Sequence, residues 1–245
     1  MRAGPAFRRP LAQLSSHIFS WDSRFLSLTA STGQVPSVTT AVASANLLAT
    51  DGTTLAAVAG MPRWQALDLE AGIAGRESPS LWLGTGDTVA WDVAPRLTEG
   101  LTLAVRFIQP VTHPAVGTGL LFLGRDDGAG FALSIESDGI AYRIVHWNDF
   151  TTNVVSSGTV TPTAGQVVLL RGVLFPDGSV RLHQSLDGGT ETSGGISAPK
   201  ALLPVSDSTR IRLNGQGAQS FTSFGALRAW LSPGTAWTPA TLERF

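Results

Sequence analysis

Short apolar runs recur about every ten residues between Ser80 and Leu231, separated by turns rich in glycine and aspartate. Within Leu101–Phe107 and Phe131–Ile135, apolar positions alternate with more polar ones, which gives a strand one core face and one polar face. This rhythm is typical of an antiparallel β-sandwich or barrel. We predict strands at Ser80–Leu83, Leu101–Gln109, Thr118–Gly124, Gly130–Glu136, Ile140–Trp147, Val167–Leu174, Ser179–Gln184, Thr209–Leu213 and Ala226–Leu231.

Aspartate–glycine pairs mark the turns between these strands. Asp138-Gly139 predicts a tight hairpin, Asp177-Gly178 joins the next strand pair, and Asp187-Gly188-Gly189 ends a strand. Glycine supplies the positive φ that such turns require. Thr238–Leu242 has an N-cap threonine followed by proline and predicts one closing helical turn with Leu242 facing inward.

Residues 1–75 lack this regular pattern and are interpreted as an N-terminal arm, with residues 76–245 as the β-sandwich. Asp51-Gly52 favours a small hairpin between Ala45–Leu48 and Leu55–Val58. We expect the arm to lie along the main domain or another subunit, and Met1–Ser23 to anchor the protein on a partner, because its apolar side chains are costly in water. A disordered tail is the alternative. The expected anchoring residues are Phe7, Arg8, Arg9, Leu11, Leu14, Ile18, Phe19 and Trp21.

Composition excludes several classes of function. The net charge is −1, so no overall field favours nucleic acid or an anionic membrane. The chain has no cysteine and therefore no disulfide, thiolate zinc site or cysteine nucleophile. No apolar run reaches the roughly 18 residues of a membrane span, and Met1–Phe25 lacks the apolar stretch of a secretory signal. We expect a chain made in the cytoplasm that binds neither nucleic acid nor membrane.

The motifs of hydrolytic catalysis are missing from the sequence. A jelly-roll glycanase needs two carboxylates facing each other across the sugar, and no E-x-D-x-x-E or E-x-x-x-E arrangement occurs. No G-x-S-x-G motif and no metal-spaced histidine pair is present. We therefore expect no enzymatic activity, and hydrolysis of a β-glucan would overturn this expectation.

One aromatic and polar cluster is a candidate carbohydrate site, since sugars stack on exposed aromatic rings beside polar groups. Tyr142, Ile144 and His146 share one face of a strand, and Trp147 lies on the other. The alternative is that the aromatic residues belong to the core and that Asn148-Asp149 only makes a turn. The candidate residues are Tyr142, His146, Trp147, Asn148, Asp149 and Phe150.

The order of elements over residues 78–245 resembles the concanavalin A-like, laminin-G-type jelly roll. The likeness lies in Gly130–Glu136 with Asp138-Gly139, in Gly165–Val173, in Phe175–Leu182 and in Phe224–Trp230 with the closing Thr238–Leu242. The resemblance implies an all-β antiparallel sandwich, here with an extended N-terminal arm. It also implies that a calcium ion at a loop rim is an option, for which Asp126 and Asp127 are the candidate ligands and a solvated turn is the alternative. We expect no other cofactor.

A second, narrower segment resembles one found in tailed-phage virion proteins. It comprises Thr50–Thr53, Met61-Pro-Arg-Trp64, Asp68, Gly72 and Leu81-Trp-Leu83. Gly84–Asp87 departs from the family pattern, in which acidic and proline residues follow the apolar strand. The resemblance implies a non-enzymatic virion component of a phage or phage-like particle.

The function that the sequence predicts is structural or adhesive display on such a particle. The protein would be associated with the tail or baseplate or decorate the capsid, held there by its arm. Its partners would be other virion proteins, its own copies in a homo-oligomer and a host surface glycan. The alternative is a free-standing carbohydrate-binding lectin.

Overall fold

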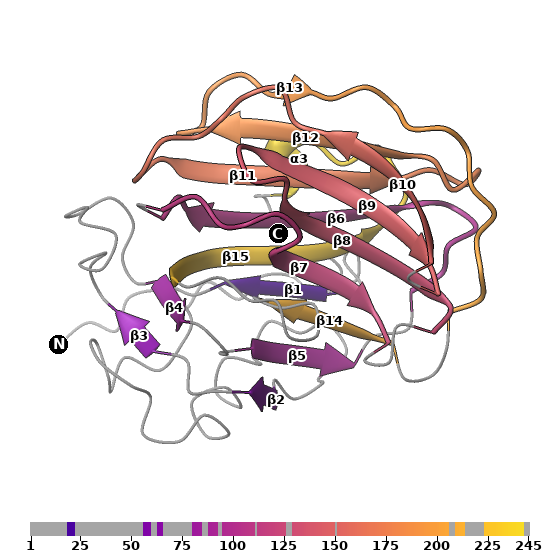
Figure 1. The fold of residues 1–245 in the computed structure, drawn as a ribbon, viewed down its shortest axis with the longest axis horizontal. Coiled ribbons are helices and arrows are strands. Elements are labelled where there is room, and N and C mark those ends of the chain that lie inside the picture. Colours follow the sequence, from indigo (N-terminus) through magenta and orange to yellow (C-terminus); the bar gives the residue numbers. More distant parts are fainter. Residues whose placement is uncertain are drawn as a thin grey trace, which may run out of the picture.

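Two antiparallel sheets stack face to face in the computed structural model of the 245-residue chain (Figure 1). The structure describes residues 19–22, 56–59, 63–65, 80–84, 88–92, 95–110, 112–125, 129–149, 151–205, 209–213 and 223–242, with the backbone alone up to residue 92 and at 223–225. All strand pairs in this part of the chain are antiparallel. The predicted all-β sandwich is confirmed.

The first sheet, called sheet A, is built around the long strand β15. Its strands in spatial order are β13 (Thr192–Ser193), β12 (Val180–Leu186), β11 (Val167–Leu174), β6 (Leu101–Ile108), β15 (Ser223–Pro233), β4 (Ser80–Gly84) and β3 (Arg63–Gln65). A further strand, β1 (Phe19–Asp22), pairs with β15 beside β4.

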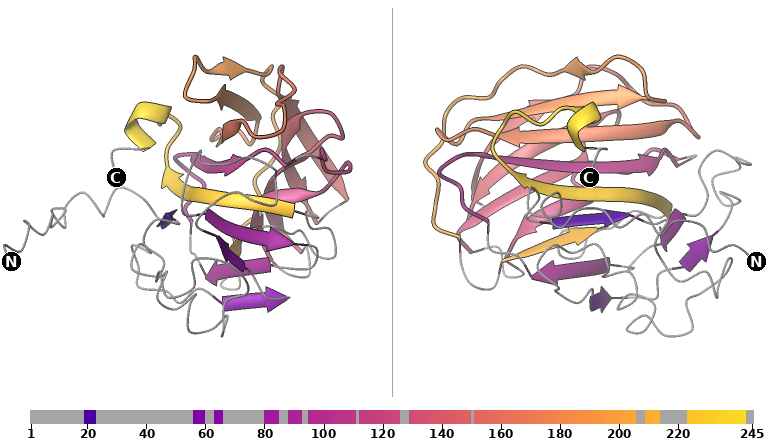
Figure 2. Two further views of the ribbon diagram at one scale, coloured as in Figure 1. Left: turned by 90° about the vertical axis from the view of Figure 1, so that its left-hand side faces the viewer. Right: turned by 180° about the vertical axis from the view of Figure 1, so that it is seen from behind.

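The second sheet, sheet B, packs against sheet A. Its strands in spatial order are β10 (Thr152–Ser157), β9 (Tyr142–Asn148), β8 (Phe131–Ser137), β7 (Gly119–Gly124), β14 (Arg210–Leu213), β5 (Thr88–Asp92) and β2 (Ala56–Ala59). Figure 2 shows the layers from the side and from behind.

The core lies between the sheets and uses the alternating positions that the sequence singles out. Leu101, Leu103, Val105 and Phe107 of β6 are fully buried in it. Facing residues from β8, such as Leu133, complete the layer. Burial of these apolar side chains is the main stabilising contribution, at about 25 cal/mol per Å² removed from water.

A smaller apolar cluster covers the outer face of sheet A. Trp230 of β15 is fully buried there beneath the short helix α3 (Pro239–Leu242), whose Leu242 contributes to the same cluster. Figure 2 shows α3 on this outer side. Thr238 caps the helix, since its hydroxyl accepts from the amide of Thr241 at 3.3 Å and its carbonyl accepts from Leu242 at 2.9 Å. The predicted closing turn is confirmed.

The predicted hairpin turns also form. Asp138 Oδ1 accepts hydrogen bonds from the amides of Ile140 and Ala141, and Gly139 has a φ of 96°. Gly178 and Gly188 have φ values of 76° and 73°. The aspartate–glycine pairs therefore join β8 to β9, join β11 to β12 and end β12.

Described parts of the N-terminal arm pair with the sandwich itself. β2 extends sheet B next to β5, and β3 extends sheet A next to β4. In the predicted hairpin, Leu55–Val58 overlaps β2, whereas Ala45–Leu48 lies outside the described residues. β1 pairs with β15 in register Phe19↔Leu231. At Phe19–Asp22 the structure thus differs from the expectation that Met1–Ser23 lies along another subunit, because the edge of β15 offers these residues backbone partners.

The one helix in the described part of the chain is a single turn, and it is too short to cross a membrane.

Candidate functional site

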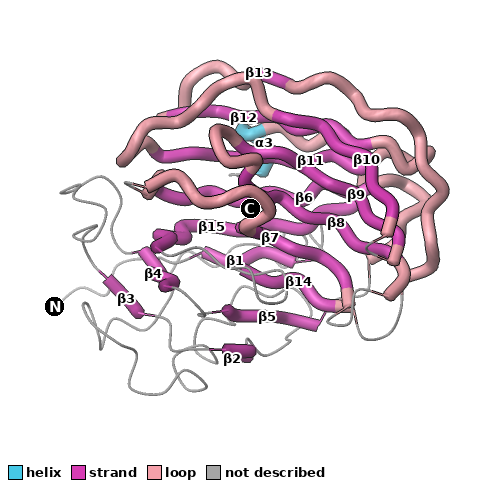
Figure 3. The backbone as a smooth tube through the Cα atoms, in the orientation of Figure 1, coloured by secondary structure: helices cyan, strands magenta, loops and turns pink. Residues whose placement is uncertain are grey.

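Several connections meet at one end of the sandwich, which we call the rim. They are the turn before β6, the β11–β12 turn, the β9–β10 turn and the segment Ala198–Val205. Figure 3 shows the connection from β13 toward β14 running along this side of the molecule. Loops held by a rigid sandwich are where such folds carry their binding residues.

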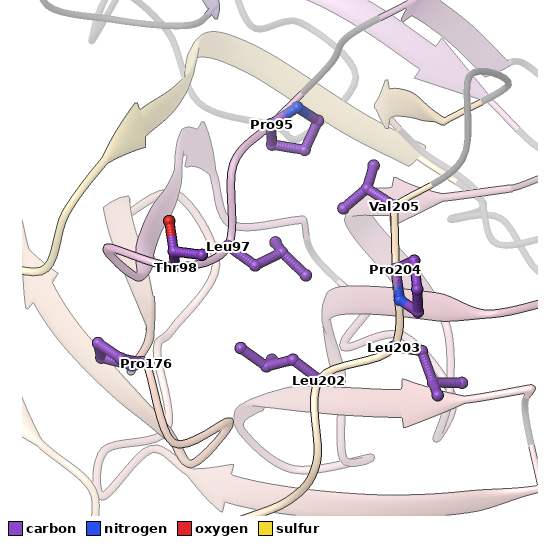
Figure 4. Close-up of a pocket in the computed structure, with 8 residues that line it drawn as sticks. All are labelled: Pro95, Leu97, Thr98, Pro176, Leu202, Leu203, Pro204 and Val205. Atoms are coloured by element: carbon purple, nitrogen blue, oxygen red, sulfur yellow. The ribbon is translucent and has the colours of Figure 1, made fainter.

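The rim contains an apolar pocket of about 580 Å³, which we call the rim pocket. Two segments face each other across it, and the side chains of Leu97 and Leu202 point into the space between them (Figure 4). The volume is within the range of small-molecule sites, roughly 300–1,000 Å³. The pocket is lined by Pro95, Leu97, Thr98, Pro176, Leu202, Leu203, Pro204 and Val205.

The pocket walls are attached to the core and to the neighbouring turns. Leu97 belongs to the main core, and Leu202, Leu203 and Val205 pack against it. The Lys200 amide donates to the Asp177 carbonyl at 3.0 Å, which fixes the segment to the β11–β12 turn. These contacts hold both walls of the pocket in place.

Polar groups lie on the other side of the same segment. Asn148 Nδ2 donates to the Ala201 carbonyl at 3.0 Å, and Lys200 Nζ donates to Thr152 Oγ1 at 2.7 Å. Asp149 is exposed and accepts from the Gly130 amide. Asp149, Thr152 and Lys200 form what we call the polar edge. The segment therefore separates an apolar pocket from a charged and hydroxyl-bearing surface.

His146 is buried beneath this segment. Its side chain has no exposed surface, and its Nδ1 lies 2.8 Å from the Gly178 carbonyl oxygen. Burial lowers the pKa of His146; the hydrogen bond to Gly178 opposes this shift, and the charge of Lys200 adds to it. The imidazole is therefore neutral in the folded protein at neutral pH.

This burial predicts a pH-dependent stability. Because the unfolded state binds the His146 proton more readily, the free energy of unfolding should rise with pH up to about 6.5, by at most about 1.4 kcal/mol per pH unit. The His146→Gln variant should lack this part of the rise. Urea unfolding of parent and variant at several pH values between 5 and 7.5 measures the difference, and parallel stability curves would contradict it.

The structure separates the residues of the predicted carbohydrate site. Tyr142 and His146 share a face, as the sequence indicates, but that face is the core. Tyr142 donates a buried hydrogen bond of 2.6 Å to Gln109 Oε1. Both residues are therefore core residues, and the prediction that they stack on a sugar is wrong. Trp147 is half-buried on the opposite face of β9, and Phe150 lies outside the described residues.

Other predicted site residues lie outside the part of the chain that the structure describes. The calcium candidates Asp126 and Asp127 are among them, and no cluster of metal-binding side chains is found in the residues that are described. The anchoring candidates Phe7, Arg8, Arg9, Leu11, Leu14 and Ile18 also lie outside. The backbones of Phe19 and Trp21 belong to β1.

Carboxylates of the described residues mostly have structural partners. Glu136 pairs with Arg143, and Glu191 pairs with Arg171. Asp138, Asp177 and Asp187 each accept hydrogen bonds from backbone amides of their own turns or of an adjacent strand. Burial raises the pKa of Glu136, against the opposing effect of Arg143, while Asp138 holds its hairpin.

The pocket itself was not anticipated from the sequence. A signal was present in Ala201-Leu-Leu-Pro-Val205, an apolar run interrupted by proline and outside every predicted strand. Proline cannot donate to a sheet ladder, so such a run points to an apolar loop. Its partners, Leu97 and Pro176, are distant in sequence and only the fold brings them together.

Comparison with solved structures finds the same jelly-roll β-sandwich fold in other proteins. The receptor-binding domain of botulinum neurotoxin type G is similar with a TM-score of 0.56 and 9% identity, over 94% of this chain and 50% of that one. The serotype D/C binding domain gives a TM-score of 0.57 and 9% identity, over 92% and 50%. The chain spans about half the length of these toxin domains.

A third similar structure is shorter. Domain 4 of AbnA, an extracellular arabinanase from Geobacillus stearothermophilus, solved in complex with arabinotriose, has a TM-score of 0.52 and 12% identity, over 78% of this chain and 87% of that one. No family model matches the sequence, and no curated protein matches it.

Proposed function

We propose that the protein is a non-enzymatic, lectin-like module that binds a carbohydrate or a carbohydrate-bearing receptor at its rim. The observation that carries the proposal is the preformed rim pocket with the polar edge beside it. Two similar folds add support, since one is named a receptor-binding domain and another was solved with arabinotriose.

The absence of catalysis is part of the proposal. Its support is that Glu136 and Glu191 are held by arginines and that Asp138, Asp177 and Asp187 are held by backbone amides. A hydrolase needs a carboxylic acid and a second carboxylate placed on either side of the scissile bond. Release of reducing sugar from a polysaccharide by the purified protein would contradict this part.

A glycan array probed with the full chain tests the binding function. We expect binding to a restricted set of glycans and a loss of about tenfold in affinity for Lys200→Ala, because a hydrogen bond from a charged group contributes roughly 1.5–3 kcal/mol. Arg181→Ala removes a cation from the outer face of sheet A and should leave binding unchanged. Absence of binding to any glycan would refute the proposal.

A second, finer proposal concerns where the module is displayed. We propose that it is carried on a tailed-phage or phage-like particle that is assembled in the host cytoplasm. Its N-terminal residues would hold it on the particle as an oligomer. The support for this proposal is the virion-like segment, two parts of which pair directly. Arg63 lies opposite Trp82 and Trp64 opposite Leu81 in the β3–β4 pair. Two parts of the segment that resembles virion proteins are therefore adjacent strands of one sheet.

Deletion of residues 1–18 tests this second proposal while leaving β1 in place. We expect the shortened chain to fold but to be missing from purified particles, and light scattering should give a smaller assembly than for the full chain. Unchanged incorporation would reject anchoring by these residues.

A further inference from the structure

We propose that the rim pocket receives an apolar substituent of the bound glycan, an alkyl or acyl group, while the polar edge binds the hydroxyl groups of the adjoining sugar. The inference rests on the proposed function and specifies its ligand class. It assigns the two sides of the Lys200–Val205 segment to two chemically different parts of one ligand.

The chemistry of the pocket disfavours an unsubstituted sugar. Thr98 provides the one side-chain hydrogen-bonding group among the lining residues. Three of those residues are prolines, which have no amide hydrogen to donate. A sugar ring placed in this pocket would meet few hydrogen-bonding side chains, and each buried hydroxyl without a partner costs roughly 1–3 kcal/mol. An alkyl chain has no such groups and gains about 0.8 kcal/mol for each buried CH₂.

The pocket is large enough for such a group and is held open by its surroundings. Its volume is about 580 Å³. Leu97 is fixed in the core, and the facing segment is tied down by the Asn148–Ala201 and Lys200–Asp177 hydrogen bonds. A preformed site avoids the cost of ordering loops on binding, so the apolar contact is retained as affinity.

The residues of the two sides are close together in the chain. Lys200 precedes Leu202 by two residues, so their Cα atoms are at most about 7 Å apart. The ammonium of Lys200, the hydroxyl of Thr152 and the exposed carboxylate of Asp149 offer donors and acceptors next to the pocket. In this proposal the sugar contacts these polar groups while its apolar substituent enters the pocket.

Matched pairs of methyl and n-octyl glycosides of glucose, galactose, mannose and N-acetylglucosamine test the inference on the full chain. Calorimetric titration below the micelle concentration should give an octyl glycoside at least about tenfold tighter binding than its methyl partner. Thr98→Trp places an indole beside the pocket and should abolish this difference between octyl and methyl glycosides. Thr190→Trp, at an exposed threonine on the turn after β12, should bind as the parent does.

The outcomes separate this inference from the proposed function. Equal affinity for methyl and octyl glycosides, together with no effect of Thr98→Trp, overturns the apolar subsite while glycan binding on the array stands. If n-octyl glycosides and 1-octanol bind with equal affinity, the sugar adds nothing, and the proposed contact between the sugar and the polar edge is wrong. The pocket then binds only the alkyl chain. If none of these probes binds, the inference is wrong. The glycan array then tests the proposed function independently.

Discussion

Gly178→Ala is expected to lower the free energy of unfolding by about 4 kcal/mol and to displace one wall of the rim pocket. Gly178 has a φ of 76°, which an alanine adopts only with strain. A Cβ at this position would also overlap the carbonyl oxygen of Lys200, a backbone atom that cannot rotate away. The substitution therefore combines backbone strain with displacement of the segment that forms the pocket wall.

Gly188→Ala is the matched control for this prediction. Gly188 has a similar φ of 73°, but an added Cβ there meets no atom within 4 Å. Its expected cost is the strain alone, about 1–2 kcal/mol. Urea unfolding followed by tryptophan fluorescence measures both variants. Equal losses of stability would show that the Lys200 segment yields easily and does not form a fixed wall.

Glu191→Gln is expected to lower the free energy of unfolding by about 3 kcal/mol at neutral pH. Glu191 receives two hydrogen bonds from Arg171, of 2.9 and 2.5 Å, and Arg171 is 5% exposed. His183 Nδ1 lies 3.4 Å from the same carboxylate. The variant leaves a buried guanidinium without its counter-charge on the outer face of sheet A.

The pH dependence gives this prediction a second test. Burial raises the pKa of Glu191, but hydrogen bonds from His183 and Arg171 and the charge of Arg171 outweigh it and lower the pKa from 4.5 to about 2. A lowered pKa stabilises the folded state above the unfolded value, and the contribution is lost as pH falls from about 4.5 toward 2. The stability difference between parent and variant should therefore shrink over this range.

Glu99→Gln serves as the control, since Glu99 is an exposed carboxylate on the turn before β6. Its effect should stay within about 0.5 kcal/mol at every pH. If Glu191→Gln and Glu99→Gln behave alike, the Arg171 pair contributes nothing measurable to stability.

Much of the sandwich could be predicted because its central strands have a strong local signal. β6 and β11 are rich in leucine and valine, and β11 has the predicted bounds Val167–Leu174. β10 was missed because Thr152–Ser157 is largely polar and exposed at a sheet edge. β13 was missed because it has two residues and depends on pairing with β12.

The candidate site was harder to predict because alternation assigns side chains to faces but does not say which face is inside. On β9, Tyr142 and His146 lie on one face and Trp147 on the other, and both faces carry apolar residues. The outer face of sheet B is itself largely buried at Val145 and Phe122. The rim pocket depends on contacts between segments about 100 residues apart, such as Leu97 and Leu202, for which the sequence carries no local pattern.

The position of β15 sets an order for folding. β15 lies between β6 on one side and β1 and β4 on the other, so residues 223–233 connect strands that come from residues 19–22, 80–84 and 101–108. During synthesis, β1 and β4 emerge from the ribosome long before their partner exists. Sheet A can therefore close only after residues 223–233 are made, which predicts slow folding with high contact order and exposed strand edges on the nascent chain. A chaperone that covers those edges would act on β1, β4 and β6 before β15 is made.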